Sequence, residues 1–263
     1  MNHLQAKLLH NRPELDDYRV LELHAPEIAA KAKPGQFVHV RVGEGHDPLL
    51  RRPFSVMLPN PQAGTVQLLI KNVGRGTDLL CHLRAGVMVD LLGPLGNSYT
   101  PPPPGRDVLL VAGGVGVAPL IYFADVLQTD PTAHYRVRGL YGGRNSNQLP
   151  LWTEFGGRCE EFVVTTEDGS AGEQGLVTDV LEAQLQRGDV QAVYTCGPRP
   201  MMAKVALMAE DAGVACYASL EQWMGCGLGA CMGCVVPTRD GAYVRVCVDG
   251  PVFEATGLDW SSI

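Results

Sequence analysis

The chain has 263 residues and a formal net charge of −7, with no basic patch, so nucleic acid is not expected as a partner. Hydrophobic residues make up 46% and charged residues 19%, which allows one large core or two to three smaller ones and excludes a disordered chain. The N-terminus lacks the apolar run of a signal peptide, and Gly113, Gly114, Gly116 and Pro119 interrupt the apolar stretch 108–124, which argues against a membrane span. We expect a soluble cytoplasmic protein.

Residues 1–100 form the first of three expected segments. Short alternating or apolar runs at 37–42, 66–71 and 87–91 are separated by Gly and Pro. This pattern is typical of a small antiparallel β-barrel or sandwich. The four consecutive prolines at 101–104 then predict a stiff linker.

A short run in this segment, Arg52-Pro53-Phe54-Ser55, is a candidate flavin site. The planar guanidinium of Arg52 can neutralise a pyrophosphate. Phe54 can pack on a flavin ring, and Ser55 can reach the edge of that ring. The simpler interpretation is a surface arginine at the start of a strand.

A second candidate motif lies at 71–77, where a strand is expected to end and a helical stretch, 78–83, to begin. Gly76 and Thr77 stand at the start of that helix. Free N–H groups and the helix dipole both favour an anion there, so these residues are candidates for a phosphate site. The simpler interpretation is a helix cap at Thr77.

The second segment, 101–215, alternates between strand and helix patterns. Strands are expected at 107–112, 135–141, 162–166 and 190–195, and helices at 117–127, 178–186 and 200–212. Such alternation predicts an α/β domain with a doubly wound parallel sheet.

The first strand of this segment runs into a glycine-rich turn and a helix, which is the expected arrangement of a dinucleotide site. We expect glycine to be needed there because a Cβ would collide with the cofactor. The residues involved are Gly113, Gly114, Gly116, Ala118 and Pro119. The pattern is G-G-x-G-x-A-P, so it matches G-x-G-x-x-G only in part.

A later strand of the same segment ends at Cys196-Gly197-Pro198 and precedes a helix that contains Met201. Ligands of parallel sheets bind at the carboxyl ends of the strands, so Cys196 is a candidate neighbour of a nicotinamide ring. A buried small residue at a strand end is the alternative. Arg144 is either a ribose contact or a solvated side chain.

The third segment, 216–263, is rich in Gly and Cys and too small to be stabilised by burial alone. Four of its five cysteines, Cys226, Cys231, Cys234 and Cys247, have the C-x4-C-x2-C…C spacing of plant-type 2Fe–2S proteins, except that the last gap is much shorter. A hairpin of 235–238 and 242–246 would return Cys247 to the others. A structural zinc site with four thiolates is the alternative.

Taken in order, these motifs resemble the ferredoxin–NADP reductase superfamily. The shared features are residues 52–55, 74–77, 113–119 and 196–198, together with 167–170 and 175–178. The four cysteines at the C-terminus make the whole chain similar to the electron-transfer subunits of dihydroorotate dehydrogenase B. The resemblance implies three domains: an FAD-binding barrel at 1–100, an NAD-binding domain at 101–215 and a 2Fe–2S domain at 216–263.

The resemblance also implies roles for individual residues. FAD would be held by Arg52, Pro53, Phe54, Ser55, Leu69, Ile70, Lys71, Gly76 and Thr77. NAD would be held by Gly113, Gly114, Gly116, Ala118, Pro119, Cys196, Gly197, Pro198 and Met201. Many superfamily members carry tyrosine where Phe54 stands, so a hydroxyl contact to the flavin would be lost.

The activity implied is electron transfer from the FMN of a dihydroorotate dehydrogenase catalytic subunit through 2Fe–2S and FAD to NAD+, in pyrimidine (UMP) biosynthesis. A heterotetramer is implied for the complex. Two alternatives remain. The small subunit of NADH-dependent ferredoxin:NADP oxidoreductase, also known as sulfide dehydrogenase, shares the same motifs. A non-catalytic module that binds zinc and a nucleotide would use the cysteines differently.

Overall fold

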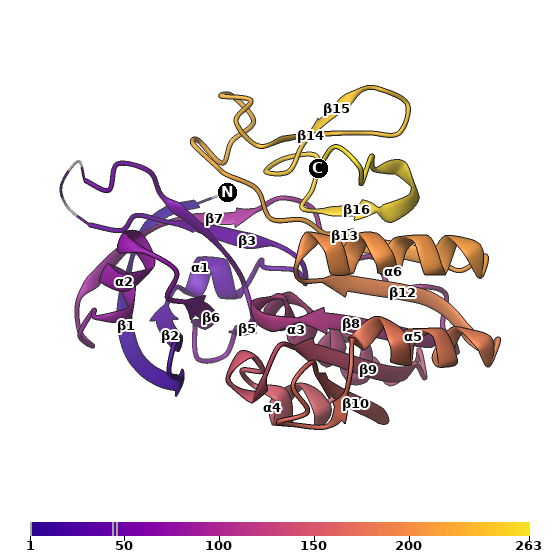
Figure 1. Cartoon of the computed structure of the whole chain (residues 1–263). Coiled ribbons are helices and arrows are strands. Elements are labelled where there is room, and N and C mark those ends of the chain that lie inside the picture. The colour runs from indigo at the N-terminus through magenta and orange to yellow at the C-terminus, as the bar shows by residue number, and fades with distance from the viewer. Residues whose placement is uncertain (1, 44, 46) are drawn as a thin grey trace.

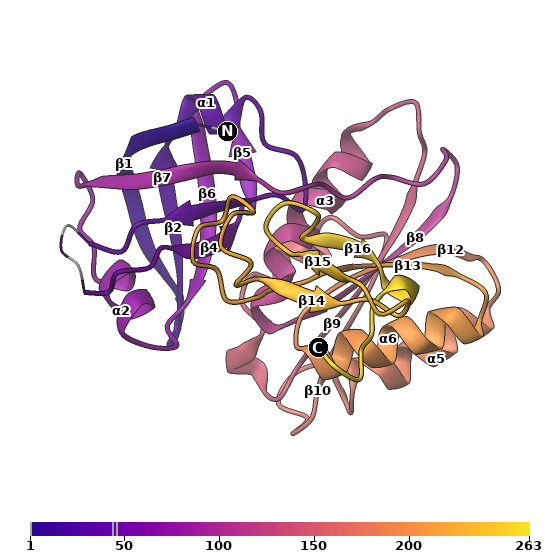
Figure 2. The same ribbon diagram turned by 90° about the horizontal axis from the view of Figure 1, so that it is seen from above.

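The N-terminal segment folds into one antiparallel sheet of seven strands, in the order β4-β3-β7-β1-β2-β6-β5. The structure is a computed structural model that describes residues 2–43, 45 and 47–263. The strands are β1 (Asn2–Leu15), β2 (Tyr18–His24), β3 (Phe37–Val40), β4 (Arg52–Ser55), β5 (Leu58–Asn60), β6 (Thr65–Lys71) and β7 (Met88–Leu95), with short helices α1 (Pro26–Ala29) and α2 (Arg75–Cys81). The sheet curls into a half-barrel, which confirms the expected antiparallel architecture (Figure 2).

Alternation along the strands explains why this sheet has one buried face. In β7, Val89 and Leu91 are buried whereas Met88, Asp90 and Leu92 are more exposed, because successive side chains of a strand point to opposite faces. The inward residues of β1, β2, β3 and β6 join the same core, which also includes Leu80 of α2. The opposite face of β3 and β4 is left for the rest of the molecule.

The second sheet also has seven strands, in the order β11-β10-β9-β8-β12-β13-β16. They are β8 (Asp107–Gly113), β9 (Arg136–Gly143), β10 (Glu161–Thr166), β11 (Glu173–Gln174), β12 (Val190–Cys196), β13 (Ala215–Ser219) and β16 (Val252–Glu254). All neighbours are parallel except β16, which runs antiparallel to β13. The expected doubly wound sheet is confirmed, and β13 continues it beyond residue 215.

Helices cover both faces of this sheet. They are α3 (Val117–Thr129), α4 (Trp152–Gly156), α5 (Val177–Gln186) and α6 (Arg199–Asp211). Alternate residues of β8 separate into two cores: Val108 and Leu110 pack with α3 and α4, whereas Leu109 and Val111 pack with α5 and α6. Buried side chains on both faces are what a parallel strand between two helical layers requires.

The C-terminal segment lies over the other two domains (Figures 1 and 2). Its hairpin, β14 (Val235–Pro237) and β15 (Tyr243–Arg245), has its turn at Gly241, as expected from the sequence. Val236, Val246 and Leu258 belong to the same core as α5 and α6. The segment is therefore stabilised partly by burial against the second domain, which the sequence did not indicate.

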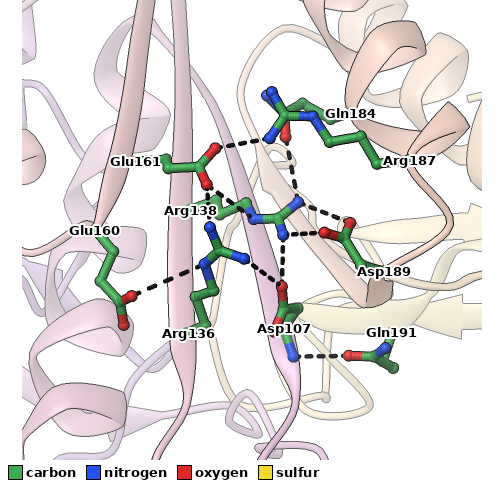
Figure 3. A network of polar contacts seen from close by, with 9 residues as sticks. All are labelled: Asp107, Arg136, Arg138, Glu160, Glu161, Gln184, Arg187, Asp189 and Gln191. Carbon is green, nitrogen blue, oxygen red and sulfur yellow. Dashed lines mark hydrogen bonds and ion pairs between the residues drawn. The ribbon is translucent and has the colours of Figure 1, made fainter.

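A network of ion pairs joins the amino ends of the parallel strands (Figure 3). The guanidinium of Arg138 is 1% exposed and pairs with Asp189 and with Asp107, the latter at 2.5 Å. Asp107 begins β8, and Glu161, which pairs with Arg136 and Arg187, begins β10. The network lies at the opposite edge of the sheet from the carboxyl ends, where ligands are expected.

Among the described residues, no helix is long and apolar enough to cross a membrane.

Candidate functional site

A cleft of about 900 Å³ lies between the half-barrel and the second sheet. Its walls include the carboxyl ends of β8, β9, β10 and β12, as expected for a doubly wound sheet. Most of the residues that the sequence indicates line it: Pro53, Phe54, Ser55, Leu69, Lys71 and Thr77 from the half-barrel, and Gly113, Gly114, Gly116, Ala118, Pro119, Cys196, Gly197, Pro198 and Met201 from the second domain. The fold thus brings the two sets of motifs to one place.

Three of the indicated residues do not line the cleft. The side chain of Ile70 is buried in the half-barrel core. Arg52 packs on Gly76, where a Cβ would lie 2.9 Å from the arginine Nε, so a larger residue would displace the guanidinium. Arg52 also donates a hydrogen bond to the carbonyl of Leu50 at 2.6 Å. The arginine therefore lies beside the first turn of α2.

Thr77 stabilises the start of α2. Its hydroxyl accepts hydrogen bonds from the backbone N–H groups of Val73 (2.9 Å) and Gly74 (3.1 Å) and donates one to the carbonyl of Gly74 (2.9 Å). The N-cap is therefore Gly74, and Thr77 is the third residue of the helix, whose hydroxyl completes the cap. The expected N-cap at Thr77, with a helix from residue 78, is wrong by three residues. The N–H groups of the first turn have no partner within the helix, so an anion beside Arg52 can still accept from them.

The three glycines of the 113–116 turn serve different purposes. A Cβ on Gly116 would lie 2.3 Å from the carbonyl oxygen of Cys196, and one on Gly113 would lie 2.7 Å from Sδ of Met201. Close packing within the protein is thus enough to require a small residue at both positions, whether or not a cofactor also approaches them. Gly114 has φ +52 and no atom within 3.9 Å of an added Cβ, and its carbonyl accepts a hydrogen bond from Tyr141 at 2.8 Å.

Cys196 lies in the cleft as a protonated thiol. Burial raises its pKa to about 12, and the carboxylate of Glu221 adds to the shift. Burial likewise raises the pKa of Glu221, which lines the same cleft. The thiol is therefore a neutral contact for a ligand and not a thiolate nucleophile at pH 7.

Three buried hydroxyls in the cleft have no hydrogen-bond partner among the described residues: those of Tyr18, Thr165 and Thr178. Buried polar groups are normally paired, so these three are candidate ligand contacts. Lys71 lies 5.5 Å from the centre of the Tyr18 ring, whose pKa burial raises to about 12. Thr178 ends the motif at 175–178, whereas sequence analysis missed Tyr18 and Thr165. Only the pairing of Tyr18 with Lys71 across β2 and β6 brings the tyrosine to the cleft. Arg144 lines the cleft too.

The four clustered cysteines lie in two neighbouring pairs. Cys226 interacts with Cys231, and Cys247 interacts with Cys234 and also with Cys226 of the other pair. Burial opposes ionisation of Cys226, but the backbone N–H groups of Leu228 and Cys231 lower its pKa to about 6. Burial raises the pKa of Cys247 to about 12.

In the part of the chain that the structure describes, no three His, Cys, Asp or Glu residues are grouped to hold a single ion. A 2Fe–2S cluster needs only two cysteines at each iron, and amide groups that point at the sulfurs suit it. The residues present therefore fit the expected cluster. Cys81 and Cys159 belong to the other two hydrophobic cores, whereas Cys216, on β13, is in the same core as Cys234 and Cys247.

Comparisons with protein families agree with this geometry. A family model described as the iron–sulfur cluster binding domain of dihydroorotate dehydrogenase B matches residues 221–259. Models of an oxidoreductase NAD-binding domain and an oxidoreductase FAD-binding domain match residues 110–206 and 7–99.

Curated relatives match over nearly the whole chain. The dihydroorotate dehydrogenase B (NAD(+)) electron transfer subunit of Desulforamulus reducens is 38% identical, and the match covers 91% of this chain and 92% of that protein. The corresponding subunit of Bacillus caldolyticus is 42% identical, with coverage of 89% and 90%.

Solved structures match as well. A structure of the NADH-dependent reduced ferredoxin-NADP oxidoreductase, reported for flavin-based electron bifurcation, has a TM-score of 0.87 at 32% identity and covers 98% of this chain and 91% of that one. A ferredoxin NADP+ reductase from Neisseria gonorrhoeae with bound FAD and NADP has a TM-score of 0.65 at 17% identity, with coverage of 81% and 92%. The second likeness shows the fold alone.

Proposed function

Because the chain belongs to the family of dihydroorotate dehydrogenase B electron transfer subunits, we propose that it passes electrons from the FMN of a catalytic subunit to NAD+, in pyrimidine biosynthesis. The observation that carries this proposal is the cleft. The cleft lies between an FAD-binding domain and an NAD-binding domain. The C-terminal segment 216–263 with the four clustered cysteines, here called the cluster segment, lies over both domains.

The chain's own residues would hold the flavin and the nicotinamide against each other. We assign FAD to Arg52, Pro53, Phe54, Ser55, Leu69, Lys71, Gly76 and Thr77, with only the backbone of Ile70, and NAD to the 113–119 turn, residues 196–198 and Met201. A flavin exchanges single electrons as well as a hydride, so it connects a cluster to a nicotinamide. The neutral thiol of Cys196 would contact the nicotinamide without competing as a nucleophile.

Cys226, Cys231, Cys234 and Cys247 would hold the cluster, which we take to be 2Fe–2S. Their arrangement in two pairs supports two irons over the single ion of a zinc site. The oxidoreductase FAD and NAD domains likewise argue against a non-catalytic zinc module.

We keep residues 1–100, 101–215 and 216–263 as the proposed domain limits, although β13 carries the second sheet to Ser219.

Oxidation of dihydroorotate itself would take place on the partner, because we assign no general base for it in this cleft. The partner would be an FMN-containing catalytic subunit, and we propose a heterotetramer with two copies of each chain. We place the complex in the cytoplasm, where the eight free cysteines would stay reduced.

One structural relative favours a second candidate. The NADH-dependent reduced ferredoxin-NADP oxidoreductase matches 98% of this chain at 32% identity, so a subunit of such an enzyme would share this cleft and this cluster segment. The partner, not the cleft, separates the two functions. Curated relatives at 38% and 42% identity favour the dihydroorotate role.

The test begins with the purified, anaerobic protein. A visible spectrum should show flavin bands over broad iron–sulfur absorption, with about two irons per chain. Mixed with its FMN partner, it should reduce NAD+ when dihydroorotate is added. A colourless protein with zinc and no flavin would contradict the proposal. Reduction of NADP+ by reduced ferredoxin, without any reaction with dihydroorotate, would favour the second candidate.

A further inference from the structure

His39, on β3, is a fully buried histidine whose two ring nitrogens have no hydrogen-bond partner among the described residues. A histidine ring carries at least one N–H donor in every protonation state, and buried donors are normally satisfied. No residue of the cleft described above explains this exception. The ring N–H of His39 is therefore available to an acceptor that comes within hydrogen-bonding distance.

The position of His39 in the sheet shows what lies on one side of it. Val38 and Val40 point into the half-barrel core, so Phe37 and His39 point to the opposite face. His39 pairs with Pro53, and Phe37 pairs with Ser55, across β3 and β4. Pro53 and Ser55 line the cofactor cleft, so His39 stands beside the strand that we assign to the flavin.

The cluster segment covers the other side of the ring. A Cβ on Gly227 would lie 2.7 Å from Nδ1 of His39, so the backbone next to Cys226 packs directly on the imidazole. Gly227 has φ +70, a conformation that glycine adopts without strain. The main-chain carbonyls of Arg51 and Cys226 face the ring, but neither forms a hydrogen bond of normal geometry with it.

We propose that His39 is a positioning residue for the iron–sulfur centre: it donates a ring N–H to the Cys226 segment and so sets both the place and the reduction potential of the centre beside the flavin. This inference rests on the proposed function, because it assumes a cluster at Cys226. Hydrogen bonds near the sulfurs of a cluster tune its potential, and supporting residues beyond the ligands hold the ligands in place. His39 is the buried donor between the two cofactor sites.

The first experiment compares His39→Leu, which keeps the bulk and removes the donor, with His39→Gln, which keeps an N–H donor. Both variants are purified anaerobically as full-length chains. Iron content, flavin content, the electron paramagnetic resonance spectrum of the reduced centre and its midpoint potential are measured. We expect normal FAD content in both. The leucine variant should show a more negative potential and an altered spectrum, and the glutamine variant should restore much of the wild-type values.

Two results would overturn the inference. One is a leucine variant with wild-type potential and spectrum. The other is an equal change in both variants, which would show that His39 acts only through packing. If the wild-type chain itself takes up no iron, the proposed function fails and not this inference alone. A wild-type chain with a normal cluster and an unaffected leucine variant would reject only the role of His39.

If the histidine variants fail to fold, a second pair of variants tests whether contact with His39 affects the iron–sulfur centre. Gly227→Ala adds a Cβ against the ring, whereas Gly241→Ala adds one at φ +85 in the hairpin turn with no atom within 4 Å. The two alanine variants have similar backbone strain, because both glycines have a positive φ and both lie in the cluster segment. Only Gly227→Ala should shift the potential and the spectrum. Equal spectra for the two variants would count against contact through His39.

Discussion

The turn at 113–116 shows how residues of one type in one motif acquire different roles. Three glycines stand together in the sequence, and a dinucleotide motif explains all of them by approach of the cofactor. In the structure, Gly113 and Gly116 are in contact with the segment 196–201, and only Gly114 has free space beside it. The sequence could show that glycine is needed there but not which atoms require it.

This difference predicts unequal effects of alanine. Gly116→Ala should prevent normal packing of β8 on β12, because the new Cβ would meet backbone atoms of Cys196 and Gly197 that cannot move independently. Gly114→Ala should cost only about 1–2 kcal/mol, the strain of a left-handed alanine. Thermal unfolding measures the stability of the two variants, and a titration with NADH measures whether each of them still binds the nucleotide. A Gly116→Ala protein as stable as Gly114→Ala would contradict the packing argument.

The buried thiols predict a dependence of stability on alkaline pH. Burial raises the pKa of Cys216, in β13, to about 12. Between pH 9 and that value the unfolded chain loses the thiol proton and the folded chain keeps it, so stability falls as pH rises. The loss should be about 1.4 kcal/mol per pH unit for this thiol.

The measurement is the free energy of unfolding in urea at several pH values from 8 to 11, for wild type and Cys216→Ala. The variant should lose less stability over this range. Below pH 8 the two curves should differ by a constant amount. An identical pH dependence in the two proteins would mean that Cys216 ionises in the folded state as readily as in the unfolded one.

At the scale of the elements, patterns of burial explain which strands the sequence could predict. The strands β8, β10 and β12 contain apolar runs, and the helices α3, α5 and α6 each bury one set of side chains, so their alternation was expected. The strand β9 was expected as well, although it contains Arg136 and Arg138. The 14 residues of β1 include Pro13 and mostly half-exposed polar side chains. Apolar and polar side chains alternate from Leu4 to Leu8, but Leu9 and Pro13 break the alternation, and pairing with β7 and β2 is what makes one strand of the whole run.

The ion-pair network of Figure 3 makes a prediction about β8 and β9. The Arg138 side chain is buried, whereas those of Asp107 and Asp189 are 21% and 41% exposed. In Arg138→Met the acids can be hydrated and the methionine fills the space, so the loss should be only about 1–2 kcal/mol. The double variant Asp107→Asn with Asp189→Asn would leave Glu161, 3.9 Å from the Arg138 Nε, as the remaining acid beside the buried guanidinium, and should destabilise the protein more.

Urea unfolding of both proteins tests this order. Arg239→Met is the control, because its partner Glu210 and the arginine are both well exposed, and exposed pairs contribute little. Its stability should stay close to wild type. If Arg138→Met proved less stable than the double asparagine variant, the buried cation would not be the dominant cost in this network.

At the scale of the whole molecule, the sequence predicted the parts of the site but not how they meet. The cysteine spacing and the order of the flavin and nicotinamide motifs are local patterns, and each is visible in a few residues. The joint cleft depends on contacts between segments far apart, such as Tyr18 with Lys71 and Cys196 with Gly116. The contact of His39 with Gly227 is of the same kind, since 188 positions separate the two residues along the chain.

The order of the three sites across the molecule predicts that flavin reactions survive loss of the cluster. The cleft between the half-barrel and the second sheet is lined by residues of those two domains and by Leu220, Glu221, Met224 and Pro251, and none of the four cluster cysteines lines it. Cys231→Ser should therefore remove the cluster and stop electron transfer to the partner. NADH should still reduce a dye through FAD.

Cys159→Ser is the matched control, because Cys159 lies near α4 with its Sγ 3.4 Å from the carbonyl oxygen of Phe155, far in sequence from the cluster segment. It should keep iron, flavin and both activities. In Cys231→Ser, NADH-to-dye activity should remain within about twofold of wild type, since the cleft is intact. Continued reduction of the partner's FMN by NADH in this variant would show that electrons reach the partner from FAD directly. The cluster segment would then serve to hold the half-barrel and the second domain together and would not carry electrons.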